Sequence, residues 1–140
     1  MAFSFFSEEI EFTLSHSESL EPWLISSIDA ENKYPGEITF IFCSDEYLLK
    51  LNQDYLKHDT LTDIITFDYS MDDLVSGDIY ISIPRVTENA DIFKCSFQDE
   101  LHRVMIHGVL HLLGYKDKTP NNKAIMRGKE DYYLTLRTFL

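Results

Sequence analysis

Two histidines four residues apart, His107 and His111, are the residues of this sequence with the clearest potential for chemistry. Residues four apart on an α-helix share a face, so both imidazoles can reach one metal ion. Gly114 is expected to end the helix, after which the carboxylate of Asp117 can supply a third ligand. Three protein ligands with a fourth position open to water are typical of a catalytic zinc site. We therefore predict one Zn²⁺ per chain, held by His107, His111 and Asp117.

The same histidine spacing also occurs without a metal, because histidines four residues apart are common on helices. The predicted helix is apolar on most of its other faces, however, and two buried histidines on one stripe need polar partners. His102 lies about 140° around the helix from His107 and is not expected to be a ligand. His16 and His58 fall in other segments and are expected at the surface.

The position directly after His107 distinguishes this motif from that of helical zinc peptidases. Those enzymes carry a glutamate there as the general base, whereas this sequence has Gly108. We interpret the glycine as the loss of the peptidase base and as open space beside the metal. Water on a zinc ion can ionise near neutral pH without that glutamate. A phosphodiester substrate could itself help to handle the proton.

The distribution of charge bears on the substrate class. The chain has a net charge of −12, whereas nucleic-acid-binding proteins are usually basic. Six of the twelve Lys and Arg residues lie between Arg103 and Lys129, where Asp117 is the only acid. This window is either a solvated loop and helix or an anion-attracting surface on an acidic body. In the second interpretation the substrate-binding cations are Lys116, Lys118 and Arg127.

Length and composition indicate the class of protein. A chain of 140 residues with 44% hydrophobic residues suits one globular domain. Cys43 and Cys95 form no CxxC motif, which favours a reducing compartment. The N-terminus lacks the basic stretch of a signal peptide, and no apolar run approaches the ~20 residues of a membrane span. We expect one metal-dependent hydrolase domain, residues 1–140, in the cytoplasm.

A mixed α/β scaffold is predicted to position the metal motif. Strands are expected over residues 9–14, 37–43, 63–69 and 78–83, and helices over 19–31, 45–56, 84–94, 97–113 and 120–140. Pro35 and Gly36 predict a turn, and Ser96 with Asp99 predicts a capping box before the motif helix. The expected fold class is α/β (α+β), a single mixed sheet of about four strands packed with helices and a zincin-like metal-binding helix.

The metal motif and several other segments resemble the YbeY family of bacterial endoribonucleases. The string HGVLHLLGY at residues 107–115 is similar to the most specific motif of that family. Met126 and Glu130 fall where its C-terminal helix carries similar residues. Segments resembling the family's LNxxYR, PTDVLSF and GDI motifs are residues 51–56, 61–67 and 77–79. The resemblance covers well over half of the chain.

The resemblance implies a compact α/β fold with a zinc site and cleavage of single-stranded RNA. It also implies maturation of precursor ribosomal RNA, notably at the 3′ end of the small-subunit RNA, ribosome quality control, and association with ribosomes or ribosomal proteins. Asp117 stands where the family usually has a histidine ligand, and carboxylates also bind zinc. Leu56 replaces an arginine implicated in activity. Lys57 and Arg103 are the candidates to bind phosphate in its place, and Arg103 is the candidate catalytic residue.

Three classes of function stay open from the sequence. The first is a zinc endoribonuclease acting on precursor ribosomal RNA, with neither DNA nor a membrane as a partner. The second is another zinc hydrolase, a peptidase or amidase, against which Gly108 argues. The third is a non-catalytic ribosome-assembly factor, which the missing arginine keeps open. Two histidines and a carboxylate also hold Fe(II) in oxygenases, but the helical spacing makes that metal less expected here.

Overall fold

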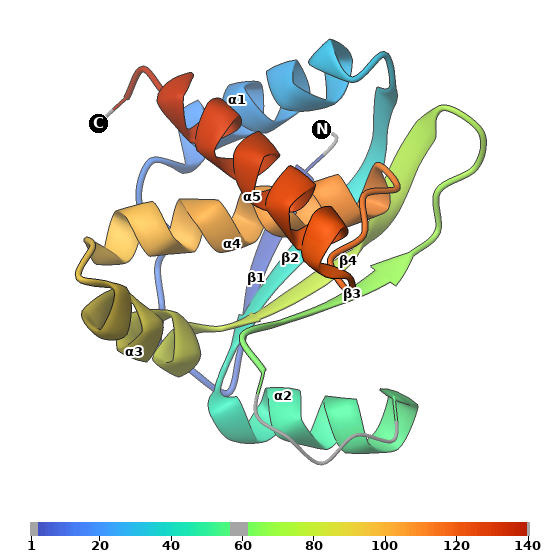
Figure 1. Cartoon of the computed structure of the whole chain (residues 1–140). Helices are drawn as coiled ribbons and strands as arrows, with labels where there is room; N and C mark the ends of the chain where they lie inside the picture. The colour runs from blue at the N-terminus through green and yellow to red at the C-terminus, as the bar shows by residue number, and fades with distance from the viewer. Residues whose placement is uncertain (1–2, 57–61, 140) are drawn as a thin grey trace.

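The computed structural model describes residues 3–56 and 62–139 and contains one mixed four-stranded sheet. The strands are β1 (Phe3–Glu8), β2 (Tyr34–Cys43), β3 (Ile64–Asp68) and β4 (Leu74–Ser82), in the order β1-β2-β4-β3. The first, second and fourth strands are parallel, and β3 pairs antiparallel with β4 at one edge. This sheet confirms the predicted fold class (Figure 1).

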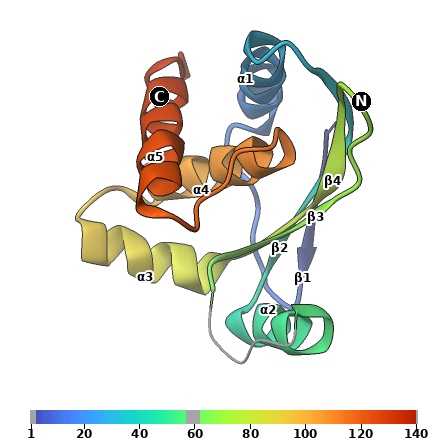
Figure 2. The same ribbon diagram turned by 45° about the vertical axis from the view of Figure 1, so that its right-hand side comes forward.

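Helices lie against both faces of the sheet. The helices are α1 (Ser17–Ala30), α2 (Asp45–Leu51), α3 (Ile83–Phe93), α4 (Phe97–Leu112) and α5 (Pro120–Thr135), and a π-helical turn, η1 (Asn52–Leu56), extends α2. Figure 2 shows α1, α4 and α5 on one side of the sheet and α2 near the other. None of the helices in the described ranges is long and apolar enough to cross a membrane.

The helix α4 is anchored in the main hydrophobic core. Its apolar side chains, among them Leu101, Met105 and Val109, are buried together with Ile79 and Ile81 of β4. Burial of each such side chain contributes about 1.5–3 kcal/mol to stability. The opposite stripe of α4 is therefore a firmly placed platform for polar side chains.

Hydrogen bonds close both ends of α4. The Ser96 hydroxyl accepts from the Asp99 amide at 3.0 Å, as the predicted cap requires. At the other end Gly114 has a φ of +104°. Its amide donates to the carbonyl of His111 and the Tyr115 amide donates to that of Leu110, both at 3.0 Å. This is a Schellman motif, and it turns the chain back across the end of the helix.

The strand predicted over residues 9–14 is wrong. The first strand is β1, at residues 3–8, and Glu9 leaves it with a φ of 54°. Ile10, Phe12 and Leu14 nevertheless pack, partly buried, against the main core. The alternating sequence therefore reflects burial of alternate side chains in an irregular segment that lies outside the sheet.

The turn predicted at Pro35 and Gly36 is also wrong. Both residues lie within β2, where the pairing with β4 shifts register between Pro35 and Ile38. A Cβ atom at Gly36 would lie 2.2 Å from the Ser76 hydroxyl oxygen. The glycine thus permits close approach of two strands, and the chain turns earlier, where Asn32 has a φ of 62°.

Candidate metal centre

Three donor atoms from α4 and the following loop converge at one point. The Nε2 atoms of His107 and His111 lie 3.0 Å apart, and Oδ2 of Asp117 lies 3.2 Å from the first and 3.3 Å from the second. Donors about 2.0–2.2 Å from a tetrahedral zinc ion are separated by roughly 3.3–3.6 Å. The observed spacing is within a few tenths of an ångström of that geometry, so these residues could hold a metal ion.

The loop that carries Asp117 is held by a shared carboxylate, that of Glu31 at the end of α1. The Tyr115 hydroxyl donates to it at 2.5 Å and the Lys129 ammonium donates at 3.1 Å. The Tyr133 hydroxyl donates to it as well. Burial raises the pKa of Glu31, but the three hydrogen bonds outweigh it and lower the pKa below its ordinary value. The ionised carboxylate thus joins α1, α5 and the loop that carries Asp117.

A second carboxylate, Glu130 of α5, orients His107 from behind. The Nδ1–H group of His107 donates to Glu130 at 2.6 Å, which leaves Nε2 free to bind a metal. Burial lowers the pKa of His107, but the hydrogen bond and charge of Glu130 outweigh it and raise the pKa. Burial and the charge of His107 lower the pKa of His111, which favours its neutral form.

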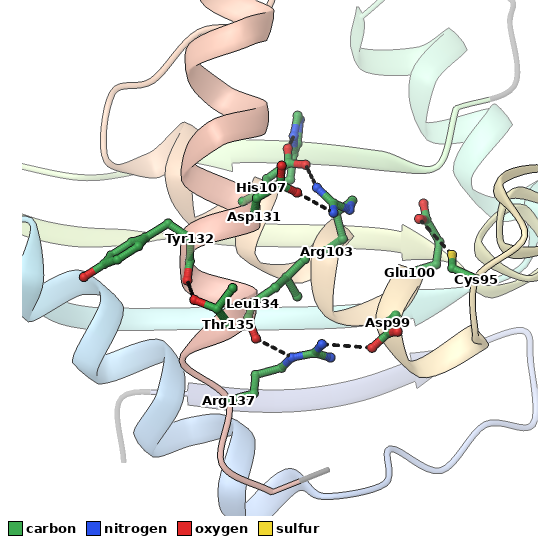
Figure 3. Close-up of polar contacts among 11 residues, drawn as sticks. Cys95, Asp99, Glu100, Arg103, His107, Asp131, Tyr132, Leu134, Thr135 and Arg137 are labelled. Carbon is green, nitrogen blue, oxygen red and sulfur yellow. Dashed lines mark hydrogen bonds and ion pairs between the residues drawn. The ribbon is translucent and has the colours of Figure 1, made fainter.

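The guanidinium of Arg103 is occupied by two carboxylates of α5. It donates to Glu130 at 2.9 Å and to Asp131 at 2.7 Å. Figure 3 shows Arg103 reaching from α4 toward Asp131, beside His107. Arg103 also lines the cavity over the donor atoms, but its charge is paired. Its predicted catalytic role stays a prediction.

A cavity of about 630 Å³ opens over the three donor atoms. Three cations, Lys118, Lys123 and Arg127, line it, and none has an ion-pair partner within residues 3–56 and 62–139. Of the predicted substrate-binding residues, Lys118 and Arg127 therefore reach the site, whereas Lys116 is exposed outside the lining. Lys57 lies outside the described residues.

Two of the other histidines, His16 and His102, lie away from the donor cluster. His102 is fully buried, and its Nδ1 accepts from Arg137 at 2.8 Å on another face of α4. His16 is exposed before α1, as expected. His58 lies outside the described residues.

Residues 4–137 match the protein-family model described as Endoribonuclease YbeY. The chain belongs to the YbeY family. Similar proteins named Endoribonuclease YbeY include one from Flavobacterium psychrophilum, 58% identical over 131 residues that cover 94% of each chain. Another, from Flavobacterium johnsoniae, is 52% identical over 90% of this chain and 91% of its own. The resemblance expected from the sequence is confirmed.

A solved YbeY-like structure agrees with the fold. The solution structure of TM1509 from Thermotoga maritima aligns with a TM-score of 0.67 and 31% identity. The alignment covers 94% of this chain and 86% of that one. The sheet and helices that position the donor atoms are therefore shared with an experimentally determined relative.

Sequence reasoning did not identify the roles of three residues of the site in this member of the YbeY family. Glu130 was named only because of the family resemblance. A carboxylate between the core residues Met126 and Tyr133 on one helix nevertheless indicates that the carboxylate is buried and has a polar partner. Lys123 belongs to the basic window, but its sequence position does not assign it to the cavity it lines. Asp63 lines the same cavity, and burial raises its pKa despite the opposing charge of His107. The only signal in the sequence was a carboxylate directly before an apolar segment predicted to be a strand.

The interpretation of Gly108 as open space beside the metal is wrong. A Cβ atom there would lie 2.9 Å from Cγ2 of Ile79 and 3.0 Å from Cδ1 of Ile64. Position 108 therefore faces the sheet, and the glycine lets α4 pack closely on β3 and β4. The peptidase-type glutamate is absent from this position, and a side chain of that size would have no room there.

Proposed function

We propose that this chain is a zinc-dependent endoribonuclease that cleaves single-stranded precursor ribosomal RNA near the 3′ end of the small-subunit RNA. The observation that carries the proposal is one cavity that contains three donor atoms 3.0–3.3 Å apart and three unpaired cations among the described residues. Cations beside a metal suit a substrate that brings phosphates. The name Endoribonuclease YbeY, borne by the relatives, supports RNA as that substrate.

The residues of the site divide the work of binding and positioning. When bound by His107, His111 and Asp117, a zinc ion supplies a Lewis acid for a phosphoryl oxygen and lowers the pKa of water. Lys118, Lys123 and Arg127 neutralise phosphates of the strand that enters the cavity. Asp63, with its raised pKa, is suited to hold a proton close to the reacting groups.

The donor atoms lie deep in the cavity, where an unpaired RNA strand can reach them. The side chains of His107 and His111 are only 19% and 27% exposed, on the floor of the cavity. A phosphodiester in a rigid duplex is held on a wide cylinder and does not reach such a floor. An unpaired strand can bend into it.

We further propose that the chain acts as a single hydrolase domain in the bacterial cytoplasm, in association with ribosomes and in their quality control. Precursor ribosomal RNA is present there and carries ribosomal proteins as it matures. The relatives that bear the YbeY name come from bacteria, which supports this setting.

The test is cleavage of precursor small-subunit RNA by the purified, zinc-loaded protein. Wild type should shorten the 3′ end, and His111→Ala should abolish cleavage. His16→Ala, which removes an exposed histidine far from the donors, should cleave like wild type. A fully paired RNA of the same sequence should stay intact. Binding of the precursor without cleavage by wild type would favour the non-catalytic assembly factor, and equal cleavage by His111→Ala would reject the metal site.

A further inference from the structure

An exposed aromatic ring lies at the edge of the metal-centre cavity. Phe93, the last residue of α3, lines that cavity although the residue is 60% exposed. Among the described residues of the lining it is the only phenylalanine, tyrosine or tryptophan. Single exposed apolar residues are ordinary, but this one faces a site already equipped for phosphates.

Phe93 and the metal ligands lie toward opposite ends of the cavity. The lining follows α4 from Glu100 to His111, a length of about 16 Å at 1.5 Å per residue. The C-terminal end of α3 lies near the N-terminal end of α4 (Figure 1). Phe93 is the last residue of α3, and α4 begins only four residues later. The donor atoms lie at the C-terminal end. A strand whose phosphate reaches the ligands can therefore extend along the cavity as far as Phe93.

The end of the cavity near the start of α4 carries groups that can contact a nucleobase. Glu100, in the first turn of α4, is buried in the cavity wall at this end, and its carboxyl oxygens can accept from the amino groups of a base. Arg127, proposed above to neutralise a phosphate of the strand, lines the same cavity. An aromatic ring face stacks on bases, and a carboxylate accepts from their amino groups.

We propose that Phe93 is a stacking subsite for an unpaired nucleobase of the RNA substrate. The base lies on the exposed ring while the attached strand runs along α4 to the donor atoms. Every base has a π-face, so such a platform tolerates different sequences and excludes paired bases, whose faces are already stacked. The inference rests on the proposed function and specifies how the same site would select single strands.

The experiment compares variants that keep or remove the aromatic face. Binding of a labelled, unstructured RNA is measured on the metal-free full chain, where cleavage does not interfere, and KM and kcat are measured on the zinc-loaded chain. Phe93→Leu should weaken binding by roughly 5- to 150-fold and raise KM with little change in kcat. Phe93→Trp should keep the affinity, and its fluorescence should be quenched by RNA. The buried Trp23 of wild type gives the background.

Two controls make the result specific. Phe6→Leu is the same substitution at a residue of β1 that is 57% exposed and lies outside the lining, and it should leave binding unchanged. An RNA with abasic sites should bind wild type as weakly as intact RNA binds Phe93→Leu. If wild type binds and cleaves RNA but Phe93→Leu does so equally well, the subsite is wrong and the proposed function stands. If wild type neither binds nor cleaves RNA, both fail.

Discussion

Nδ1 of His107 and Oε2 of Glu130 lie 2.6 Å apart across the contact between α4 and α5. Glu130 is only 5% exposed, and its other oxygen accepts from Arg103. If the carboxylate turned away from His107, Oε2 would lose its hydrogen-bond partner inside the protein, which is costly for a buried charged group. The orientation of a helix-borne ligand is thus set by a residue 23 positions later in the chain.

Replacement of Glu130 by glutamine should weaken zinc binding by about 10- to 100-fold, because outer partners of metal-bound histidines commonly have effects of that size. The amide keeps the size of the side chain and removes the charge that orients His107. Competition with a chromogenic chelator measures the affinity. Asp131→Asn is the matched control, since Asp131 shares Arg103 with Glu130 but does not contact His107. Unchanged zinc affinity in Glu130→Gln would refute the orienting role.

Removal of the Tyr115 hydroxyl should lower zinc affinity by about 10-fold, because its bond to Glu31 holds the loop just before Asp117. Tyr133→Phe removes another hydroxyl bonded to the same carboxylate, but from α5. Each variant should lose roughly 1.5–3 kcal/mol of stability, as for hydrogen bonds to charged groups. Only Tyr115→Phe should change the zinc affinity measured by competition with the chelator. Equal zinc affinities in the two variants would mean that the loop is held by other contacts.

Alanine at two helical glycines should change stability in opposite directions. A Cβ atom at Gly128 on α5 would meet no described atom from elsewhere in the chain within 4 Å, so Gly128→Ala should add up to about 1 kcal/mol through helix propensity. At Gly108 the same gain is opposed by contacts with Ile79 and Ile64, and overpacking costs about 1–3 kcal/mol. Gly108→Ala should therefore be destabilised by up to about 2 kcal/mol. Urea unfolding measures both, and a stabilised Gly108→Ala would contradict the close helix–sheet contact.

The parts of the site that depend on local geometry could be predicted from the sequence. His107, His111 and Asp117 lie within eleven consecutive residues, and helix periodicity with a glycine stop is enough to bring them together. Glu130 could not be placed, because its contact with His107 depends on how α5 crosses α4. Whether position 108 faces the metal site or the sheet likewise depends on how α4 packs against the sheet.

The first strand could not be predicted for a related reason. Alternation of apolar residues reports which side chains are buried, and residues 9–14 bury alternate side chains without pairing to a strand. The strand β1 has a less regular pattern and owes its place to parallel pairing with β2, from Phe3 opposite Ile38 to Glu8 opposite Cys43. Pairing between segments so far apart is not encoded in either segment alone.

RNA affinity should depend on salt despite the acidic chain. Each phosphate neutralised on a single strand contributes about −0.7 to the slope of log K against log salt, so three cavity cations give roughly −2. Lys118→Glu or Arg127→Glu should weaken binding and make the slope shallower. Lys50→Glu and Lys116→Glu change the net charge equally but lie outside the cavity, and should have little effect. Equal losses in all four variants would indicate a general charge effect.

Stability should fall between neutral pH and pH 4 because of His102. Burial and the charge of Arg137 lower its pKa to about 4, against about 6.5 in the unfolded chain. Between these values the unfolded chain binds a proton that the folded chain excludes, so acidification favours unfolding. The loss on going from pH 7 to pH 4.5 is about 2 kcal/mol. Urea titrations at both pH values measure it.

The matched comparison for this pH effect is His102→Gln, which offers Arg137 an oxygen acceptor and does not titrate. It should lose stability at pH 7 but show a smaller decline on acidification than wild type. Carboxylates that contribute to acid unfolding are the same in both proteins, so the difference isolates His102. Identical pH dependence in the two proteins would show that folding does not lower the pKa of His102.

The carboxylate of Glu31 connects residues 84, 98 and 102 positions away along the chain. Synthesis starts at the N-terminus, so Glu31 leaves the ribosome long before Tyr115 and longer still before Tyr133. Contacts of such separation also close late in folding, because loop closure must first be overcome. The loop that carries Asp117 is therefore ordered only after Tyr115, Lys129 and Tyr133 have been made. A nascent chain that has not yet been extended past Tyr133 has no completed nuclease centre beside the ribosome, the particle whose RNA it is proposed to cut.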